Sequence, residues 1–222
     1  MDRSHPPVIV AHKVNRYPLL RRYLAMRIPI LEIDVSVHNG HLVVQHGMDF
    51  SNVGHVRGEI MRIGYLLMEH RDPLWRPMLL DEYLREVGGR AGIWLDLKCC
   101  GVEDEIVRIV RRYRVSPVVV SSPYHESLKS IKELDPSITT MLGNIICKPV
   151  DPIGMIRATR ADGISIEHKY IDRAFVECVH KAGLRVAAWT VNDVARAREL
   201  IGMGCDYIIT NVPEKIIGLV RR

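Results

Sequence analysis

The sequence predicts an α/β protein that folds as a single (β/α)₈ barrel, a TIM barrel. Short apolar runs rich in β-branched residues alternate with amphipathic segments eight times along the 222 residues. Several amphipathic segments are followed by glycine, which commonly ends helices in the left-handed conformation. No charge-rich or Gly/Ser-rich linker interrupts the alternation. We therefore expect residues 1–222 to form one domain with a closed parallel sheet.

Each repeat pairs one expected strand with one expected helix. The strands are expected at Val8–His12, Pro29–Val35, Gly92–Lys98, Val118–Ser121, Thr139–Gly143, Gly163–Glu167, Arg185–Thr190 and Tyr207–Thr210. The helices are expected at Tyr17–Met26, Leu79–Val87, Asp104–Arg114, His125–Glu133, Pro152–Ala158, Asp172–Ala182, Val194–Ile201 and Pro213–Val220. A doubly wound open sheet is the alternative, but it would need fewer strands and usually a Gly-rich phosphate loop, which this chain lacks.

Composition narrows the class of protein. Apolar residues make up 47% and charged residues 26% of the chain, which is ordinary for a globular protein in water. The net charge of +5 is spread along the chain, so we expect no nucleic-acid partner, although attraction of a phosphate-bearing anion remains compatible. Five cysteines form no C-x-x-C pair, and neither a secretory leader nor a membrane-spanning apolar run is evident, so a cytoplasmic protein is expected.

Two carboxylates on one expected strand give the strongest chemical signal. Glu32 and Asp34 are two residues apart in an otherwise apolar run, so both point to the same face of the strand. Buried together, they would repel each other and lose their hydration. A divalent cation with oxygen ligands, Mg²⁺ or Ca²⁺, is the simplest compensation. The alternative is that nearby arginines form ion pairs with the two carboxylates.

Further polar residues fall at the carboxyl ends of neighbouring strands. Asp96 and Lys98 repeat the two-residue spacing on the third expected strand, and His12 ends the first. Trp189 lies at the end of the seventh. Barrel enzymes build their sites on this rim, so we expect these side chains to meet in one place.

A hairpin is expected to bring His46 to the same rim. Asn39-Gly40 is a strong signal for a two-residue type I′ turn, which pairs Val37 with Leu42 and sets His46 opposite Ile33. Ideal pairing would point His46 away from Glu32 and Asp34. A bulge or the strand end must therefore re-aim it.

Together these residues resemble the glycerophosphodiester phosphodiesterase family of (β/α)₈ metal-dependent phosphodiesterases over nearly the whole chain. The matching motifs are His12-Lys13, Glu32-Ile33-Asp34, His46-Gly47, Asp96-Leu97-Lys98, Trp189-Thr190-Val191-Asn192 and the segment from Gly204 to Pro213. The chain departs from the family where Lys13 replaces an arginine, where Asp96 replaces a common glutamate, and where a Pro-Glu-Asn-Thr element is absent. In His12-Lys13-Val14-Asn15, His46-Gly47 and Asp96-x-Lys98 it looks more like the sphingomyelinase D branch of the same superfamily.

The resemblance and the chemistry of the residues together imply a mechanism. One divalent cation, Mg²⁺ or Ca²⁺, would be held by Glu32, Asp34 and Asp96. His12 and His46 would act as base and acid. Substrate contacts would come from Lys13, Asn15, Lys98 and Trp189. The expected substrate is a small-molecule or lysolipid phosphodiester whose neighbouring hydroxyl attacks the phosphorus and gives a cyclic phosphate.

Two other functions remain open at this point. A non-catalytic barrel that binds phosphate or a lipid head group would keep Lys13, Lys98 and Trp189 but would not need two histidines. A sugar-phosphate isomerase or aldolase barrel could use Lys98 for a Schiff base or proton transfer, but it would not explain the Glu-x-Asp pair. The long connection Gly47–Pro77 is expected to pack over the barrel or to act as a substrate lid.

Overall fold

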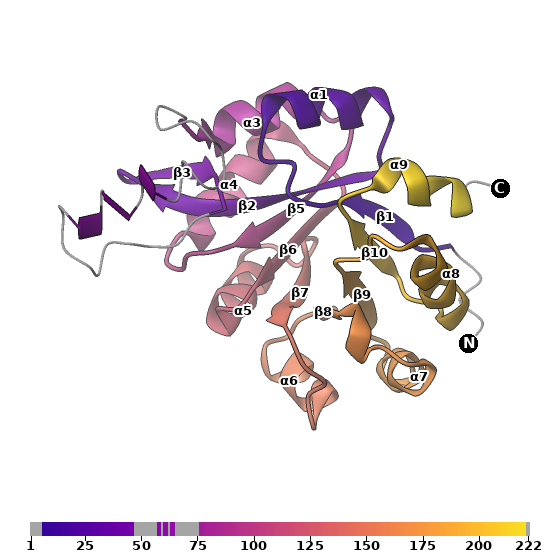
Figure 1. Ribbon diagram of the computed structural model, residues 1–222. Coiled ribbons are helices and arrows are strands. Elements are labelled where there is room, and N and C mark those ends of the chain that lie inside the picture. The colour runs from indigo at the N-terminus through magenta and orange to yellow at the C-terminus, as the bar shows by residue number, and fades with distance from the viewer. Residues whose placement is uncertain (1–5, 47–56, 59, 62, 65–75, 221–222) are drawn as a thin grey trace.

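Eight parallel strands close into a barrel in the computed structural model, which describes residues 6–46, 57–58, 60–61, 63–64 and 76–220 (Figure 1). Closure is evident because β1 pairs with β2 on one side and with β10 on the other. This confirms the expected (β/α)₈ fold, whereas the extent of the domain over residues 1–222 stays a prediction. The barrel strands are β1 Val8–Ala11, β2 Ile30–His38, β5 Gly92–Leu97, β6 Val118–Ser122, β7 Thr139–Ile145, β8 Gly163–Glu167, β9 Arg185–Trp189 and β10 Tyr207–Thr210.

Helices between the strands surround the barrel (Figure 1). They are α1 Tyr17–Ala25, α3 Leu80–Val87, α4 Glu103–Tyr113, α5 His125–Leu134, α6 Pro152–Ala158, α7 Arg173–Lys181, α8 Val194–Met203 and α9 Pro213–Ile216, with 3₁₀ turns at His168–Tyr170 and Ile217–Leu219. Gly88 and Gly204 end α3 and α8 in the left-handed conformation, with φ of 56° and 90°. The last helix is shorter than expected, because the chain tightens into a 3₁₀ turn after Ile216.

The hairpin after β2 has the register that its turn predicts. Asn39 and Gly40 have φ of 50° and 74°, as a type I′ turn requires. The antiparallel ladder to β3 (His41–Val44) pairs Val35 with Val44 and Val37 with Leu42. A further short strand, β4 (Met78–Leu79), pairs with β3 and leads directly into α3.

Apolar side chains fill the barrel interior. Val10, Ile30, Trp94, Val119, Met141, Ala187 and Ile209 form one buried cluster, which is separate from the larger core between the strands and the helices. The Trp94 ring meets Tyr207 edge to face, with ring centroids 5.3 Å apart. This packed apolar cluster closes the barrel interior below the carboxyl ends of the strands.

Part of one sequence expectation lies outside the described residues. The connection Gly47–Pro77 falls mostly within residues 47–56, 59, 62 and 65–75, so the expectation of a cover or lid there is not tested. Among the residues that are described, no helix is both long and apolar enough to cross a membrane.

Candidate active site

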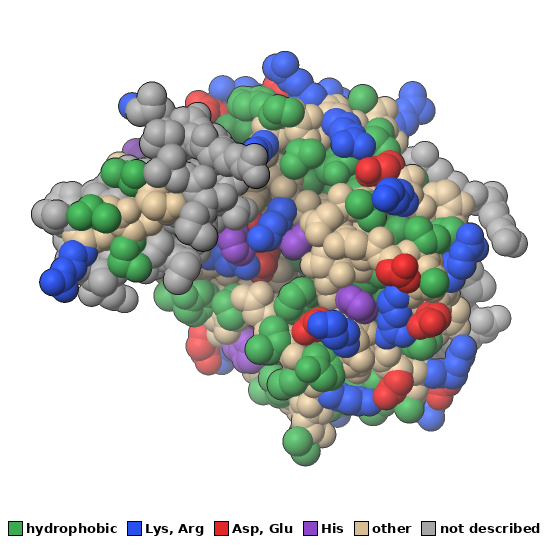
Figure 2. All heavy atoms as spheres, viewed as in Figure 1, with side chains coloured by type: hydrophobic (Ala, Val, Ile, Leu, Met, Phe, Trp, Pro, Cys, Tyr) green, Lys and Arg blue, Asp and Glu red, His purple; other side chains and the backbone are tan. Residues whose placement is uncertain are grey.

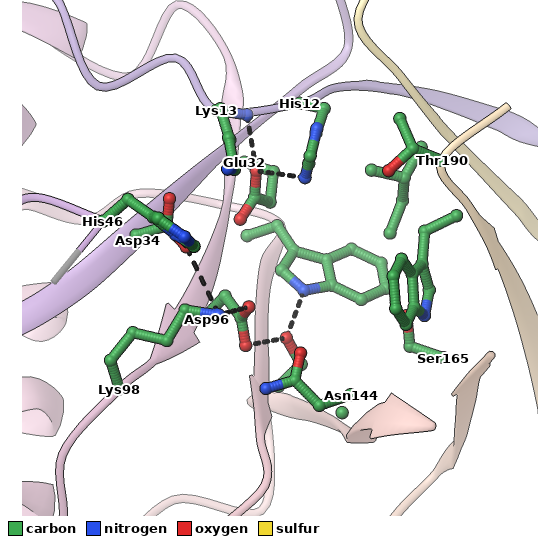
Figure 3. A pocket seen from close by; sticks show the side chains of 15 residues that line it. His12, Lys13, Glu32, Asp34, His46, Asp96, Lys98, Asn144, Ser165 and Thr190 are labelled. Atoms are coloured by element: carbon green, nitrogen blue, oxygen red, sulfur yellow. Dashed lines mark hydrogen bonds and ion pairs between the residues drawn. The ribbon is translucent and has the colours of Figure 1, made fainter. Parts of the chain in front are cut away.

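A cavity of about 300 Å³ opens at the carboxyl end of the barrel strands (Figure 2). Every catalytic, metal-binding or substrate-binding residue predicted from the sequence lines this cavity except Asn15, which instead donates a hydrogen bond to the lining residue Asp34. Figure 3 shows the charged residues on one side and Asn144, Ser165 and Thr190 on the other. The lining residues are His12, Lys13, Glu32, Asp34, His46, Trp94, Asp96, Lys98, Ser121, Gly143, Asn144, Ser165, Trp189, Thr190 and Ile209.

Three carboxylates converge within this cavity. Glu32 and Asp34 project from the same face of β2, and the β2–β5 register sets Asp96 directly beside Asp34. One oxygen from each of the three acids can be chosen so that all lie within 4.8 Å of one another. Glu32 is 3% and Asp34 1% exposed, so water can screen little of their mutual repulsion.

Lys98 and the chain after β1 hold these acids in place. The Lys98 ammonium lies 2.5 Å from Asp96 Oδ2 and 3.3 Å from Asp34 Oδ1. The Lys13 backbone N–H donates to Glu32 Oε2 at 2.6 Å. The Asn15 side chain donates to Asp34 Oδ2 at 2.8 Å and accepts from the Asp34 backbone N–H at 3.1 Å.

The surroundings move the three carboxyl pKa values in different directions. Burial, together with the charges of Asp34 and Asp96, raises the pKa of Glu32 well above its ordinary value. Burial also raises the pKa of Asp96, although Lys98 opposes it. For Asp34 burial is outweighed by the hydrogen bond from His46 and the charge of Lys98, so its pKa lies well below the usual range. The neighbours of Asp34 therefore stabilise its negative charge, whereas the negative charge of Glu32 is the least stabilised of the three.

The two histidines reach the acids from opposite sides. His12 Nε2 lies 3.9 Å from Glu32 Oε2, and its Nδ1 lies 2.8 Å from Asn211 Oδ1. Burial lowers the pKa of His12, which favours a neutral ring. His46 Nδ1 lies 3.1 Å from Asp34 Oδ1.

The end of a strand, and not a bulge, brings His46 into the site. The β3 ladder stops at Val44, and the Gln45 N–H then bonds to the Asp34 carbonyl. Beyond that point the alternation of a paired strand no longer applies to His46. The sequence left both possibilities open, and the unshifted β2–β3 register up to Val44 decides between them.

The sequence analysis did not predict a functional role for four polar residues that the fold brings into or beside the site. Ser121 donates to Asp96 Oδ1 at 2.9 Å, and Asn211 contacts His12. Asn144 and Thr190 line the cavity. The position of Ser121 at a strand end was a usable signal, but Asn144 is aimed by a register shift between Leu142 and Ile145 and by a positive φ of 56°, which the sequence does not reveal.

Comparisons with known proteins agree with this geometry. The model of the glycerophosphoryl diester phosphodiesterase family matches residues 90–215, which is more than half of the chain. The chain belongs to this family. The match includes Asp96, Lys98 and Trp189, whereas the two histidines, Glu32 and Asp34 precede it.

Individual relatives extend the likeness to the rest of the chain. A glycerophosphodiester phosphodiesterase of Caldanaerobacter subterraneus is 25% identical over 97% of this chain and 98% of its own length. YhdW of Bacillus subtilis, named for the same activity, is 29% identical over 62% of this chain and 60% of its own length. A phosphodiesterase of Oleispira antarctica, solved in complex with the product sn-glycerol-3-phosphate, shares the fold at a TM-score of 0.78, with 22% identity over 97% of both chains.

Family membership assigns the chain to the phosphoric diester hydrolases, as its sequence motifs predicted. The fold and the enzyme class are thereby confirmed. The family membership also disfavours the non-catalytic and isomerase alternatives. Lys98 argues against a Schiff-base mechanism as well: burial lowers its pKa, but Asp96 and Asp34 outweigh that effect and raise it, so the amine stays protonated and cannot act as a nucleophile.

Replacing Glu32 by glutamine should stabilise the protein in the presence of a chelator. Because the folded-state pKa of Glu32 is raised, its charge opposes folding at neutral pH, and this cost disappears as the pH falls below the ordinary glutamate pKa. The side-chain oxygen of glutamine can still accept from the Lys13 N–H. We expect the melting temperature of Glu32→Gln in EDTA to exceed that of the unaltered protein by a few degrees at pH 7 and to match it near pH 4.

Asp34→Asn is the matched control for this measurement. The folded-state pKa of Asp34 is depressed, so its charge favours folding above the unfolded pKa, and the variant should melt at a lower temperature at pH 7. Equal destabilisation by both substitutions would contradict the assignment of Glu32 as the least compensated acid.

Proposed function

We propose that this protein is a metal-dependent phosphodiesterase that cleaves glycerophosphodiesters or lysophospholipid-type phosphodiesters with two histidines as acid and base. The observation that carries the proposal is the convergence of three carboxylates, two histidines and two lysines in one cavity of a family member. The product bound to the Oleispira antarctica phosphodiesterase, sn-glycerol-3-phosphate, supports a glycerol phosphate as part of the substrate.

The donor set fits a hard divalent cation. Its three side chains offer only carboxylate oxygens, which Mg²⁺ and Ca²⁺ prefer, and like charges are crowded in a buried place where one cation would relieve their repulsion. Glu32, Asp34 and Asp96 would hold the ion. When bound there, it would supply positive charge to a non-bridging phosphate oxygen.

The neighbours of His12 suit it to the role of base. The side-chain oxygen of Asn211 accepts the Nδ1 proton, which leaves the lone pair of His12 on Nε2, the nitrogen that faces the acids. Burial keeps this ring neutral. His12 would remove the proton from the attacking hydroxyl, which is a role worth about 10²–10⁴-fold in rate.

His46 would serve as the acid that protonates the leaving alcohol. Its Nδ1 lies 3.1 Å from Asp34 Oδ1, and this contact fixes the orientation of the ring. Its side chain is 36% exposed, compared with 19% for His12, so an alcohol leaving past His46 has the shorter route to solvent.

The remaining predicted residues would position the substrate. Lys13 and Lys98 add positive charge beside the phosphate, although a lysine lacks the bidentate fork of arginine. Trp189 presents its ring to the cavity, and its indole nitrogen is buried without a hydrogen-bond partner among the described residues. Asn15 acts through Asp34 rather than by lining the cavity.

The proposed function predicts which esters turn over and under which conditions. Glycerophosphocholine, glycerophosphoethanolamine, lysophosphatidylcholine and bis-p-nitrophenyl phosphate should be assayed with and without EDTA. We expect at least one glycerol-containing substrate to be hydrolysed, and we expect EDTA to abolish the reaction until Mg²⁺ or Ca²⁺ is restored. Full turnover after exhaustive chelation would exclude the metal-dependent mechanism.

Histidine substitutions test the acid and base roles. His12→Ala and His46→Ala should each lower kcat by about 10²–10⁴-fold while the melting temperature changes little. The double variant should lose less than the product of the two single losses, because both residues serve one proton-transfer sequence. His38→Ala, at the tip of the β2–β3 hairpin, is the control and should keep its turnover. Near-normal turnover in either single variant would overturn the two-histidine assignment.

A neighbouring hydroxyl on the substrate is proposed to be the attacking group. It is already held next to the phosphorus, so its attack has an entropic advantage over that of free water. Phosphorus NMR during turnover of a lysophospholipid should then show a cyclic phosphate before any phosphomonoester. Equal rates for substrates without that hydroxyl, together with ¹⁸O from solvent in the first product, would instead establish direct hydrolysis.

A further inference from the structure

A chain of hydrogen bonds enters the carboxylate cluster from the apolar interior of the barrel. The Trp94 indole Nε1 donates to Ser121 Oγ at 2.8 Å, and Ser121 Oγ donates to Asp96 Oδ1 at 2.9 Å (Figure 3). Trp94 is 1% and Ser121 4% exposed, so water has little access to either polar group. Two neighbouring parallel strands supply the three residues, and the β5–β6 register sets Asp96 beside Ser121.

The chemistry of the donors fixes the direction of this chain. An indole N–H can only donate, so Ser121 must offer it a lone pair. A hydroxyl has one proton, and the proton of Ser121 is then directed to Asp96. Without Trp94 the hydroxyl could rotate to other acceptors. The buried indole therefore selects the one orientation in which Ser121 supports a carboxylate.

Asp96 is the one acid of the three that a different strand supplies, so its orientation depends on contacts of its own. It comes from β5, whereas Glu32 and Asp34 share β2. Lys98 contacts Asp96 Oδ2, and Ser121 contacts Oδ1, so the two contacts together fix the plane of the carboxylate. Hydrogen-bond partners behind a metal ligand commonly change metal affinity by about 10–100-fold, because they orient the ligand before the ion binds.

We propose that Trp94 and Ser121 form a relay that positions the Asp96 carboxylate for binding a divalent cation. Trp94 and Ser121 are positioning residues, since both act through Asp96. The inference rests on the proposed metal site and adds the reason why a large indole and a small hydroxyl occupy neighbouring strands at this level of the barrel. It also gives Trp94 a second role beyond filling the interior.

The test measures metal binding directly, without relying on turnover. Isothermal titration calorimetry of the full chain, stripped of metal, should give Mg²⁺ and Ca²⁺ affinities for the unaltered protein and for Ser121→Ala. We expect Ser121→Ala to lower the affinity for whichever ion the unaltered protein binds more tightly by at least tenfold. Ser121→Thr keeps a hydroxyl at the same carbon and should restore metal affinity to within about threefold of the unaltered protein. This rescue is expected if the hydroxyl orients Asp96, and it is not expected if Ser121 only packs against its neighbours.

Ser165→Ala is the matched control. Ser165 also lines the cavity and is also 4% exposed, but it lies on β8, across the barrel from the acids. Its removal should leave metal affinity within about twofold of the unaltered protein, because removing a distant hydroxyl leaves the ligand geometry unchanged. Equal losses in Ser121→Ala and Ser165→Ala would overturn the relay.

A double-mutant cycle tests whether Trp94 acts through Ser121. Trp94→Phe removes the N–H but keeps an aromatic ring, and it should weaken metal binding several-fold. Combined with Ser121→Ala, it should add no further loss, because the relay is already broken. Fully additive losses would overturn the proposal that Trp94 orients Ser121. Metal binding by the unaltered protein together with unchanged affinity in Ser121→Ala would refute the relay alone, whereas no metal binding by the unaltered protein would refute both the relay and the proposed metal site.

Discussion

The burial of three carboxylates in one small cavity is the constraint on which the rest of this site depends. Taking such charges out of water is costly, and crowding them adds repulsion. Hydrogen-bond donors from several elements contact the carboxylates and offset part of this cost: the Lys98 ammonium, the Lys13 backbone N–H, the Asn15 amide and the Ser121 hydroxyl. The compensation is uneven, because Asp34 receives most of it and Glu32 receives the least. This unevenness supports the proposed cation site.

The barrel makes this arrangement possible because the residues that stabilise the fold are different from the polar residues that form the site. Apolar side chains inside the barrel and between the strands and the helices form two buried clusters that fix the strand ends. The polar residues stand on those ends, where each can be changed without opening the core. Trp94 links the two layers, since its ring belongs to the interior cluster and its N–H reaches the carboxylate network through Ser121.

The cavity is electrically asymmetric, and this asymmetry bears on substrate recognition. Its charged side chains come from β2, β5 and the segments that follow β1, β3 and β5, whereas the wall formed by β7, β8 and the end of β9 presents uncharged groups. A phosphodiester has a charged phosphate between two less polar substituents. We propose that the charged wall takes the phosphate when a cation is bound, and that the uncharged wall with Asn144, Ser165 and Trp189 takes one of the substituents.

The amino-acid sequence by itself determined the fold class, the strand that carries Glu32 and Asp34, and the register of the hairpin. These follow from local rules: hydrophobic periodicity, the alternation of side chains along a strand and the geometry of the Asn39-Gly40 turn. The identity of the candidate acids, histidines and lysines was also readable, because they fall at strand ends and match the motifs of a family to which the chain belongs.

Only the tertiary structure decided which of these residues touch one another. The strand end that turns His46 toward Asp34, the register shift that aims Asn144 into the cavity, and the contact of Asn211 with His12 each depend on how distant strands pack. The relay from Trp94 through Ser121 to Asp96 depends on the alignment of β5 with β6. Such contacts join residues far apart in the chain, and no local pattern in the sequence encodes the register between the barrel strands that brings them together.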